Sequence, residues 1–423
     1  MSGYRTDFVP NSGEETVMHG AMDERVQAAP AVLTRPFNRV VAKTRASARA
    51  RLGVTLFTGF SEAEDPWRQF EATAFGTGFQ SFDWLSAWHE GAGAAEGVEP
   101  AIALVSLDGE TIMLAPFGIE RRMGLRCLVW LGGKIADYKG PLVAPQFARR
   151  VPAGQFGPLW AQIVPLLPAH DFIALENQPA LLGVAANPFI ELGGVSAPDA
   201  GYVFALPPTY EALIARFRPE TRRTDKSKER KLAERGKLEF RIAESGEEAA
   251  RMAADILDRK AAQLRAQGVA SIFEDKAYRA AFLGLAALPP KRRMLQVAAL
   301  TLDGEFLSGS IAHVWKGRAT LMVHTYEPAH AKHSPGRLHM LKLMKASIEA
   351  GHWLYDLSVG HAAYKDSFCD VPMPLFNYVA AAKPWGIAAA AASRTRFSLK
   401  RAVKANATLM GWLRSLRATV SGR

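Results

Sequence analysis

The chain has 423 residues, of which 48% are hydrophobic and 22% charged, and its formal net charge is +11. This composition predicts a globular protein long enough for two domains or a fused pair. The basic balance suits nucleic acid, phosphorylated ligands or an anionic membrane surface equally, so charge alone selects no partner.

The two cysteines, Cys127 and Cys369, lie far apart and outside any metal-binding motif, which argues against a disulfide framework or a structural zinc site. We therefore expect a reduced, cytoplasmic setting and no bound metal. Residues 1–17 lack the apolar core of a secretory signal, and no segment approaches the ~18 apolar residues of a spanning helix. Any membrane contact is expected to be peripheral, at the inner face of the membrane.

Residues 1–52 are polar and then rich in arginine and alanine, so we expect a disordered basic segment there. A regular pattern begins after it. The expected elements, in chain order, are a strand at 54–57, a helix at 62–75, a loop entering a helix over 79–88, strands at 100–107, 111–120 and 125–131, a helix at 155–167 and a strand at 172–175.

The segment 132–141 is a glycine-rich loop that contains Asp137, Tyr138 and Lys139. These polar side chains could face a ligand. The loop could equally be a long connection between the sheet and the next helix, and both interpretations remain open.

A second half begins near residue 209 with an apolar helical face and continues into a strongly basic run that includes Arg222 and Arg223. Such a run is usually a solvated helix, but its basic excess also suits an acidic or phosphorylated partner. The later elements are a strand at 238–242, helices at 247–267 and 278–288, strands at 294–302, 306–314 and 319–326, a helix at 338–351 and a strand at 353–357.

The tetrapeptide Leu107-Asp-Gly-Glu110 recurs as Leu302-Asp-Gly-Glu305, each time between two apolar strands. A third strand, a Gly/Pro loop, a helix and a closing strand follow in both halves, which indicates two copies of one unit. We predict an α/β (α+β) protein whose tandem domains, 53–205 and 206–386, contain mixed, mostly antiparallel sheets flanked by helices.

Residues 319–351 are predicted to form strand, loop and helix, and the loop ends in Ser334-Pro335-Gly336. Ser334 is expected to cap the helix, Pro335 fits its first position, and Gly336 would let a ligand approach the backbone. Unpaired N–H groups at a helix start bind phosphate, although an ordinary capped helix would have the same sequence.

Residues 387–423 form a basic C-terminal tail, in which 394–417 has the pattern of an amphipathic helix. Such a helix could lie on an anionic membrane or dock on the preceding domain. The chain contains no serine nucleophile elbow, HExxH motif or P-loop, so hydrolase, metalloprotease and P-loop kinase chemistry lack their required parts.

The order of elements resembles the GNAT acyltransferase core, and residues 209–368 resemble more specifically the CelD-type family, which is related to the FemX aminoacyltransferases. The motifs that carry this resemblance are Arg222-Arg223 with the basic helix, the Leu302-Asp-Gly-Glu305 hairpin, Tyr326-Glu-Pro328, Ser334-Pro-Gly336, Tyr355-Asp-Leu-Ser-Val-Gly360, Tyr364-Lys365, and, in the first half, Phe79-Gln-Ser with Trp84 and Asp137-Tyr138.

The resemblance implies acyl transfer from a thioester such as acetyl-CoA to an amine or hydroxyl acceptor. The pyrophosphate of the CoA would lie on Ser334, Gly336 and Arg337, with His333 or Lys332 adding charge. Compared with the usual GNAT loop, this one keeps a single glycine, and its proline removes one N–H donor.

Direct transfer requires a base, an N–H group that polarises the thioester carbonyl, and an acid for the leaving thiolate. The strand at 320–325 would supply the N–H group. Each candidate side chain also has a structural alternative as a capping, paired or core residue. The candidates are Asp356 and His324 as bases, Tyr364 as the acid, Lys365, Arg222, Arg223, Asp137 and Tyr138 for substrate binding, and His361 and Glu176 as weaker options.

Three functions follow. The first is acyl transfer from acyl-CoA, with a small-molecule or glycan-precursor acceptor in cell-surface polysaccharide synthesis. The second is a FemX-like transferase that uses aminoacyl-tRNA, the one interpretation with a nucleic-acid partner. The third is a catalytically silent accessory protein that docks at a membrane assembly.

Overall fold

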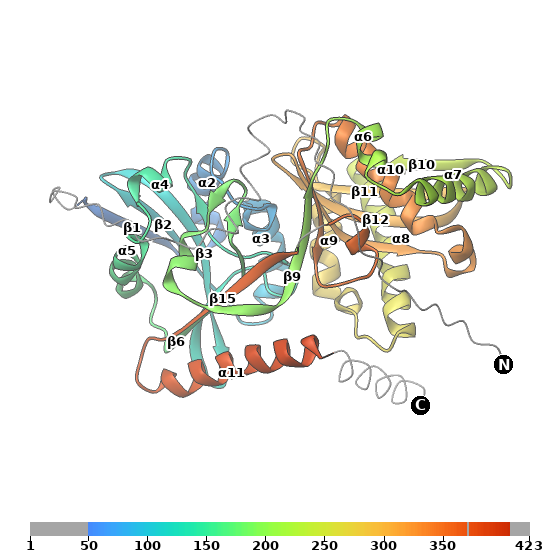
Figure 1. Cartoon of the computed structure of the whole chain (residues 1–423). Coiled ribbons are helices and arrows are strands. Elements are labelled where there is room, and N and C mark those ends of the chain that lie inside the picture. The colour runs from blue at the N-terminus through green and yellow to red at the C-terminus, as the bar shows by residue number, and fades with distance from the viewer. Residues whose placement is uncertain (1–49, 370–371, 407–423) are drawn as a thin grey trace, which may run out of the picture. The chain divides into compact units, whose positions relative to one another are not determined.

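The computed structural model describes residues 50–369 and 372–406, which belong to one compact unit that starts at Arg49 (Figure 1). Nearly all of the segment expected to be disordered, and the tail beyond residue 406, lie outside the described residues. The domain boundaries at residues 205 and 386 stay predictions.

Two hairpins have the same backbone geometry. They are formed by β2 (Glu99–Leu107) with β3 (Glu110–Arg122), and by β11 (Leu295–Leu302) with β12 (Glu305–Trp315). At both turns the Asp-Gly pair has positive φ, 52° and 84° in the first and 50° and 85° in the second, as a tight two-residue turn requires.

The same aspartates fix the strand next to each hairpin. Asp108 Oδ1 accepts the N–H of Arg51 at 2.8 Å, and Asp303 Oδ1 accepts the N–H of Lys237 at 2.7 Å. These bonds hold the residues just before β1 (Leu52–Phe57) and β10 (Leu238–Ile242), which pair with β2 and β11. The repeated unit predicted from the tetrapeptide is therefore present in the structure.

The remaining elements agree in type with the predicted ones, and most of their ends differ by a few residues. In the first half they are α2 (Phe60–Glu71), α3 (Phe82–Trp88), β4 (Leu125–Trp130), α5 (Phe156–Ile163) and β6 (Phe172–Pro179). The short elements β5 (Leu142–Val143) and α4 (Phe147–Arg150) were not predicted. In the second half they are α6 (Tyr210–Ala215), α7 (Pro219–Ala233), α8 (Gly246–Ala266), α9 (Lys276–Ala287), β13 (Arg318–Tyr326), α10 (Pro335–Glu349) and β14 (Leu354–Val359).

Two strands that were not predicted join the halves. β9 (Val195–Ala205) pairs with β14 of the second half, and β15 (Met373–Ala381) pairs with β6 of the first half and with β9. Both contain residues that are poor strand formers, such as Pro198 and Pro374, so propensity gave no signal. The result is one mixed sheet in the order β1-β2-β3-β4-β6-β15-β9-β14-β13-β12-β11-β10.

The helix α11 (Gly386–Ala405) lies along the sheet beneath β6 and β15 (Figure 1). Its side chains Ala389, Ala390 and Phe397 are buried against Val129 and Phe172 of the first half. The described part of the predicted tail is thus a docked helix that starts at residue 386, because its apolar face packs on the sheet. Within the described ranges, no helix is both long and apolar enough to cross a membrane.

Candidate functional site

The neighbouring parallel strands β13 and β14 separate part-way along their length. They pair only where Arg318–Thr320 face Leu354–Asp356, and beyond that point a cavity of about 420 Å³ lies between them. The lining residues are Lys260, Gln263, Leu321, Met322, His324, Tyr326, Ala331, Ser334, Pro335, Gly336, Arg337, Met340, Leu357, Ser358, Val359, Tyr364, Lys365 and Phe368.

A β-bulge turns the backbone of β13 at this cavity. Ala312 of β12 faces Leu321, but the next residue, Ile311, faces Val323, so Met322 has no partner in the register. A bulge re-aims backbone groups and leaves its extra residue unpaired. Because Met322 lines the cavity, the predicted N–H donor segment lies where it could face a bound carbonyl.

The first turn of α10 closes one end of the cavity. Pro335 is in the first turn, as predicted, but Ser334 makes no side-chain cap and has a left-handed backbone with φ of 50°. Its Oγ instead accepts a hydrogen bond from Lys228 Nζ at 2.7 Å, so the capping prediction was wrong. The N–H groups of Gly336 and Arg337, in the first turn, have no acceptor within α10 itself.

Gly336 is needed for close packing inside the protein. A Cβ atom at this position would lie 2.9 Å from His324 Cε1 and 3.4 Å from Tyr326 Cδ1. The glycine therefore lets the first turn of α10 approach β13, which places the backbone of this turn beside the cavity.

Basic side chains surround the start of α10. Arg235 of the loop after α7 donates to His333 Nε2 at 3.3 Å, and Lys228 of α7 reaches Ser334. Partial burial and the nearby charges of Lys332 and Arg235 lower the pKa of His333. This concentration of cations beside the first N–H groups of α10 favours an anion.

Arg337, predicted to bind the cofactor, is largely committed to the protein. Its Nε donates to both carboxylate oxygens of Asp225, at 2.9 and 3.0 Å, and its guanidinium stacks on Phe217 and Phe368. One nitrogen, Nη2, is buried without a partner within the described part of the chain. Arg337 therefore mainly fixes α7 on α10, with one N–H group left for a ligand.

His324 lines the cavity as a neutral ring. Ser308 Oγ donates its proton to the Thr325 carbonyl at 2.8 Å, so His324 Nε2, 3.1 Å away, must donate to Ser308 Oγ. The other ring nitrogen, Nδ1, then carries a lone pair. Burial lowers the pKa of His324 to about 4, which makes the ring a hydrogen-bond acceptor at neutral pH.

Tyr364 and Lys365 are adjacent but differ in availability. Tyr364 lines the cavity and is 41% exposed, and partial burial raises the pKa of its phenol. Lys365 Nζ donates to the carbonyl oxygens of Ser358, Val359 and Gly360 at 3.2, 3.2 and 2.8 Å. All three ammonium hydrogens are used, so Lys365 has no donor left for the predicted binding of substrate.

Asp356 is completely buried and lies outside the cavity lining. Its carboxylate accepts hydrogen bonds from Arg318 at 2.6 Å, Tyr138 Oη at 2.9 Å and the N–H of Ser358 at 2.7 Å. A carboxylate so fully bound gives no support to the predicted role of general base, which stays a prediction.

The other predicted substrate residues lie outside the cavity lining. Tyr138 is fully buried on Asp356, and Asp137 accepts a hydrogen bond from Ser358 Oγ on the cavity wall. Arg222 and Arg223 lie on α7, where Arg223 is exposed. The weaker options also lie elsewhere, since Glu176 binds Arg122 and His361 contacts Asp366.

Sequence reasoning missed two cavity residues, Lys260 and Gln263, and Lys228, which bonds the lining residue Ser334. Lys228 was one charge in a long basic run, and nothing distinguished it from its neighbours. Lys260 and Gln263 of α8 lie far from the motif in sequence and carry no local signal; burial lowers the pKa of Lys260, whose Nζ donates to Gln263 at 3.1 Å.

The site thus combines a splayed pair of parallel strands with a helix start, within a mixed sheet flanked by helices. Residues 219–366, from α7 to the end of the cavity, match the family model described as an acetyltransferase (GNAT) domain. This part of the second half is thus similar to GNAT acetyltransferase domains. A search of the curated proteins found no match.

Comparison with solved structures shows likeness in fold. FemX superposes with a TM-score of 0.51 at 10% sequence identity, covering 78% of this chain and 97% of that one. A tandem GNAT protein from the clavulanic acid biosynthesis pathway gives 0.43 at 14% identity, covering 79% and 99%. The C-terminal domain of a putative lysylphosphatidylglycerol synthetase from Agrobacterium fabrum gives 0.42 at 14%, covering 67% and 85%.

Proposed function

We propose that the protein transfers an acyl group from acyl-CoA, with acetyl-CoA as the first candidate, to an amine or hydroxyl acceptor. The observation that carries this proposal is the cavity between β13 and β14, which joins a strand bulge to a helix start whose first N–H groups have no acceptor within the helix. The pantetheine arm would lie between the strands, and the pyrophosphate would lie on the N–H groups of Gly336 and Arg337.

The cations near α10 support the phosphate end of this pose. Lys228, Arg235 and Lys332 lie around His333 and Ser334, where they would neutralise a pyrophosphate. The apolar part of the lining, including Leu321 and Met340, suits the uncharged arm of the donor.

In the proposed reaction the acceptor nitrogen or oxygen attacks the thioester carbonyl, the C–S bond breaks, and the thiolate takes a proton. A backbone N–H of the bulge at Met322 would polarise the carbonyl. Tyr364, protonated at neutral pH, would donate the proton to the sulfur. His324 Nδ1 would accept a hydrogen bond from the attacking nitrogen or oxygen and so orient it. The proton of that attacking group would then pass to solvent.

A FemX-like reaction with aminoacyl-tRNA is the second candidate. The observation that favours it is the basic surface of α7, where Arg223, Lys226 and Arg230 are exposed. An RNA acceptor stem would bind there through its phosphates and present the aminoacyl ester to the same cavity. Three further proposals have no specific observation in their favour. They are a role in polysaccharide synthesis, membrane docking through the C-terminal helix, and a catalytically silent accessory function.

Calorimetry with acetyl-CoA tests the first proposal. Lys228→Glu is expected to weaken binding at least about 10-fold, because it places a carboxylate beside the pyrophosphate. The matched control is Lys226→Glu, an identical charge change at an exposed position of the same helix.

Failure of the wild-type protein to bind acetyl-CoA, or equal weakening by both variants, would sink the proposal. Gel-shift binding of aminoacylated tRNA that falls steeply with salt, without acetyl-CoA binding, would favour the second candidate. If neither ligand binds, the accessory function is the remaining proposal.

A further inference from the structure

A second, larger cavity lies in the first half of the chain. Strands β4 and β6 pair only where Cys127–Leu128 face Phe172–Ile173, and then separate like β13 and β14. Beyond this point a cavity of about 630 Å³ is lined by Val129 and Trp130 of β4, by Ala174 and Glu176 of β6, and by α11. Its size is typical of a small-molecule site.

One wall of this cavity is apolar and partly aromatic. Trp88, Val98, Val129, Trp130 and Phe397 line it, and all five side chains are at least 95% buried. Because these side chains are held by packing, the wall is preformed and would take an apolar body without rearrangement.

The opposite side carries charges that are mostly paired. Arg122 Nη1 bonds Glu176 at 2.5 Å, and its Nε contacts Glu120, so these three charges satisfy one another. Lys134 is bonded to Glu96 at 3.1 Å. Within residues 50–369 and 372–406, two lining cations, Lys139 and Arg396, have no hydrogen bond or ion pair from their side chains; Arg396 is exposed on α11, whereas Lys139 is partly buried.

Lys139 is fixed in place by its backbone. Its N–H donates to the Asn177 carbonyl at 3.0 Å, and its neighbour Tyr138 is buried and bonded to Asp356. Lys139 is itself partly buried, and this burial lowers its pKa. A buried ammonium without a direct partner is costly, and an anion beside it would remove that cost.

We propose that this cavity is a second ligand site, which binds a small amphipathic anion with its carboxylate on Lys139 and its apolar body against Trp88, Trp130 and Phe397. The site differs from the acyl-donor cavity in kind, since no helix start lines it and its one partly buried cation without a partner suits one carboxylate. The inference does not depend on the proposed acyl transfer.

Octanoate and 1-octanol are matched probes, because they share an eight-carbon chain and differ in charge. Calorimetry on the full chain is expected to show octanoate binding at least about 10-fold more tightly than octanol. Lys139→Met, which keeps the side-chain length and removes the charge, is expected to abolish that preference.

Lys134→Met is the matched control, because Lys134 lines the same cavity but is already paired with Glu96 and has a side chain 65% exposed. It should leave octanoate binding within about 2-fold of the wild type. Ala392→Trp on α11, where the alanine is exposed at the cavity, should block both probes without touching the charge.

Equal binding of the two probes, octanoate binding unaffected by Lys139→Met, or binding that survives Ala392→Trp would each overturn the proposal. Saturating octanoate should leave acetyl-CoA affinity unchanged, since the two cavities share no lining residue. Competition between the two ligands would place octanoate in the other cavity and would also contradict the proposal.

Discussion

Lys365 anchors the chain after β14 with all three of its ammonium hydrogens. Its side chain is 94% buried, and burial lowers its pKa. The residue type was predicted to hold a substrate anion, but the fold has used its donors on three carbonyl groups. The sequence could predict that Lys365 carries a hydrogen-bond donor. It could not predict the acceptors of that donor, because they depend on how the backbone of residues 358–360 turns.

Replacing Lys365 with methionine is expected to lower the free energy of unfolding by about 2–4 kcal/mol, because three carbonyl groups lose their donor. Urea denaturation measures this loss. Lys345→Met is the control, an exposed lysine on α10 whose ion pair with Glu349 contributes under about 1 kcal/mol. A variant with unchanged stability and a raised KM would mean that Lys365 binds substrate.

Tyr364→Phe is expected to lower kcat about 100-fold, since the leaving thiolate loses its proton donor. Acetyl-CoA affinity should stay within about 2-fold, because the ring is retained. Thiol release measured against pH separates the effects. A loss confined to affinity, or kcat near the wild-type value, would assign Tyr364 a binding or packing role.

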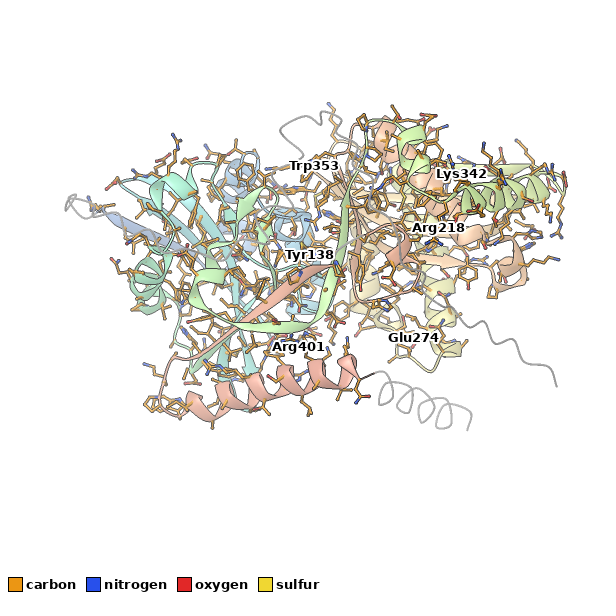
Figure 2. All side chains as sticks on the ribbon, in the orientation of Figure 1. Tyr138, Arg218, Glu274, Lys342, Trp353 and Arg401 are labelled. Carbon is orange, nitrogen blue, oxygen red and sulfur yellow. The ribbon has the colours of Figure 1, made fainter. Side chains whose placement is uncertain are left out.

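Helix α7 docks on α10 through charges that the linear sequence could not pair. Asp225 binds Arg337, and Glu229 binds Lys342 at 2.6 Å, while Arg230 and Glu234 form the expected pair four residues apart. Figure 2 labels Lys342 on α10 beside α7. The sequence predicted a solvated basic helix. Only the packing of α7 on α10 showed that its acidic residues Asp225 and Glu229 face α10.

The Asp225–Arg337 pair is expected to couple by about 1–3 kcal/mol in a double-mutant cycle, because both side chains are largely buried and Arg337 Nε contacts both carboxylate oxygens. Asp225→Asn, Arg337→Gln and the double variant complete the cycle. The more exposed pair Glu229–Lys342 is the comparison, with an expected coupling below about 1 kcal/mol. Coupling energies in the reverse order would contradict this account of the docking.

The two halves are tied together at the centre of the sheet. β9 pairs with β14 of the second half, and β15 pairs with β6 of the first half. The loop at 132–141 also contacts β14. Tyr138, labelled in Figure 2, donates to Asp356, and Asp137 accepts from Ser358. Through Ser358, the first half shapes one wall of the candidate acyl-donor cavity.

Asp137 makes this junction sensitive to pH. Burial raises its pKa to about 6 from 3.8, so the folded chain holds this proton more tightly than the unfolded chain. Its contribution to stability is therefore greatest below about pH 4 and is lost as pH rises through about 6. The loss is at most about 3 kcal/mol, at about 1.4 kcal/mol per pKa unit.

Asp137→Asn keeps the acceptor for Ser358 and removes the titration, so its stability relative to the wild type should rise between pH 4 and pH 7. Urea denaturation at both pH values measures this difference. Asp255→Asn, at an exposed carboxylate of α8, should leave the pH profile unchanged. If the free energies of unfolding of Asp137→Asn and the wild type differ by the same amount at both pH values, Asp137 is not the source of the pH dependence.

The sequence by itself determined the local structure: the two Asp-Gly hairpins, the helices with apolar periodicity, the proline at the start of α10 and the repeat. These follow from residues close together in the chain, where turn geometry and periodicity act directly. It also indicated the candidate acyl-donor loop, whose glycine and neighbouring cations lie within a few positions.

Only the tertiary structure decided which polar groups are available to a ligand. Three predicted site residues have side chains of the right chemistry, but most of their hydrogen-bonding groups are already used within the protein. Asp356 is bonded to Arg318, Lys365 to three carbonyl groups, and Arg337 to Asp225. The unpaired ammonium of Lys139 was equally invisible, because a charge is known to lack a partner only when every neighbour is placed. Hydrogen bonds and ion pairs form between residues distant in sequence, and the fold alone brings them within reach.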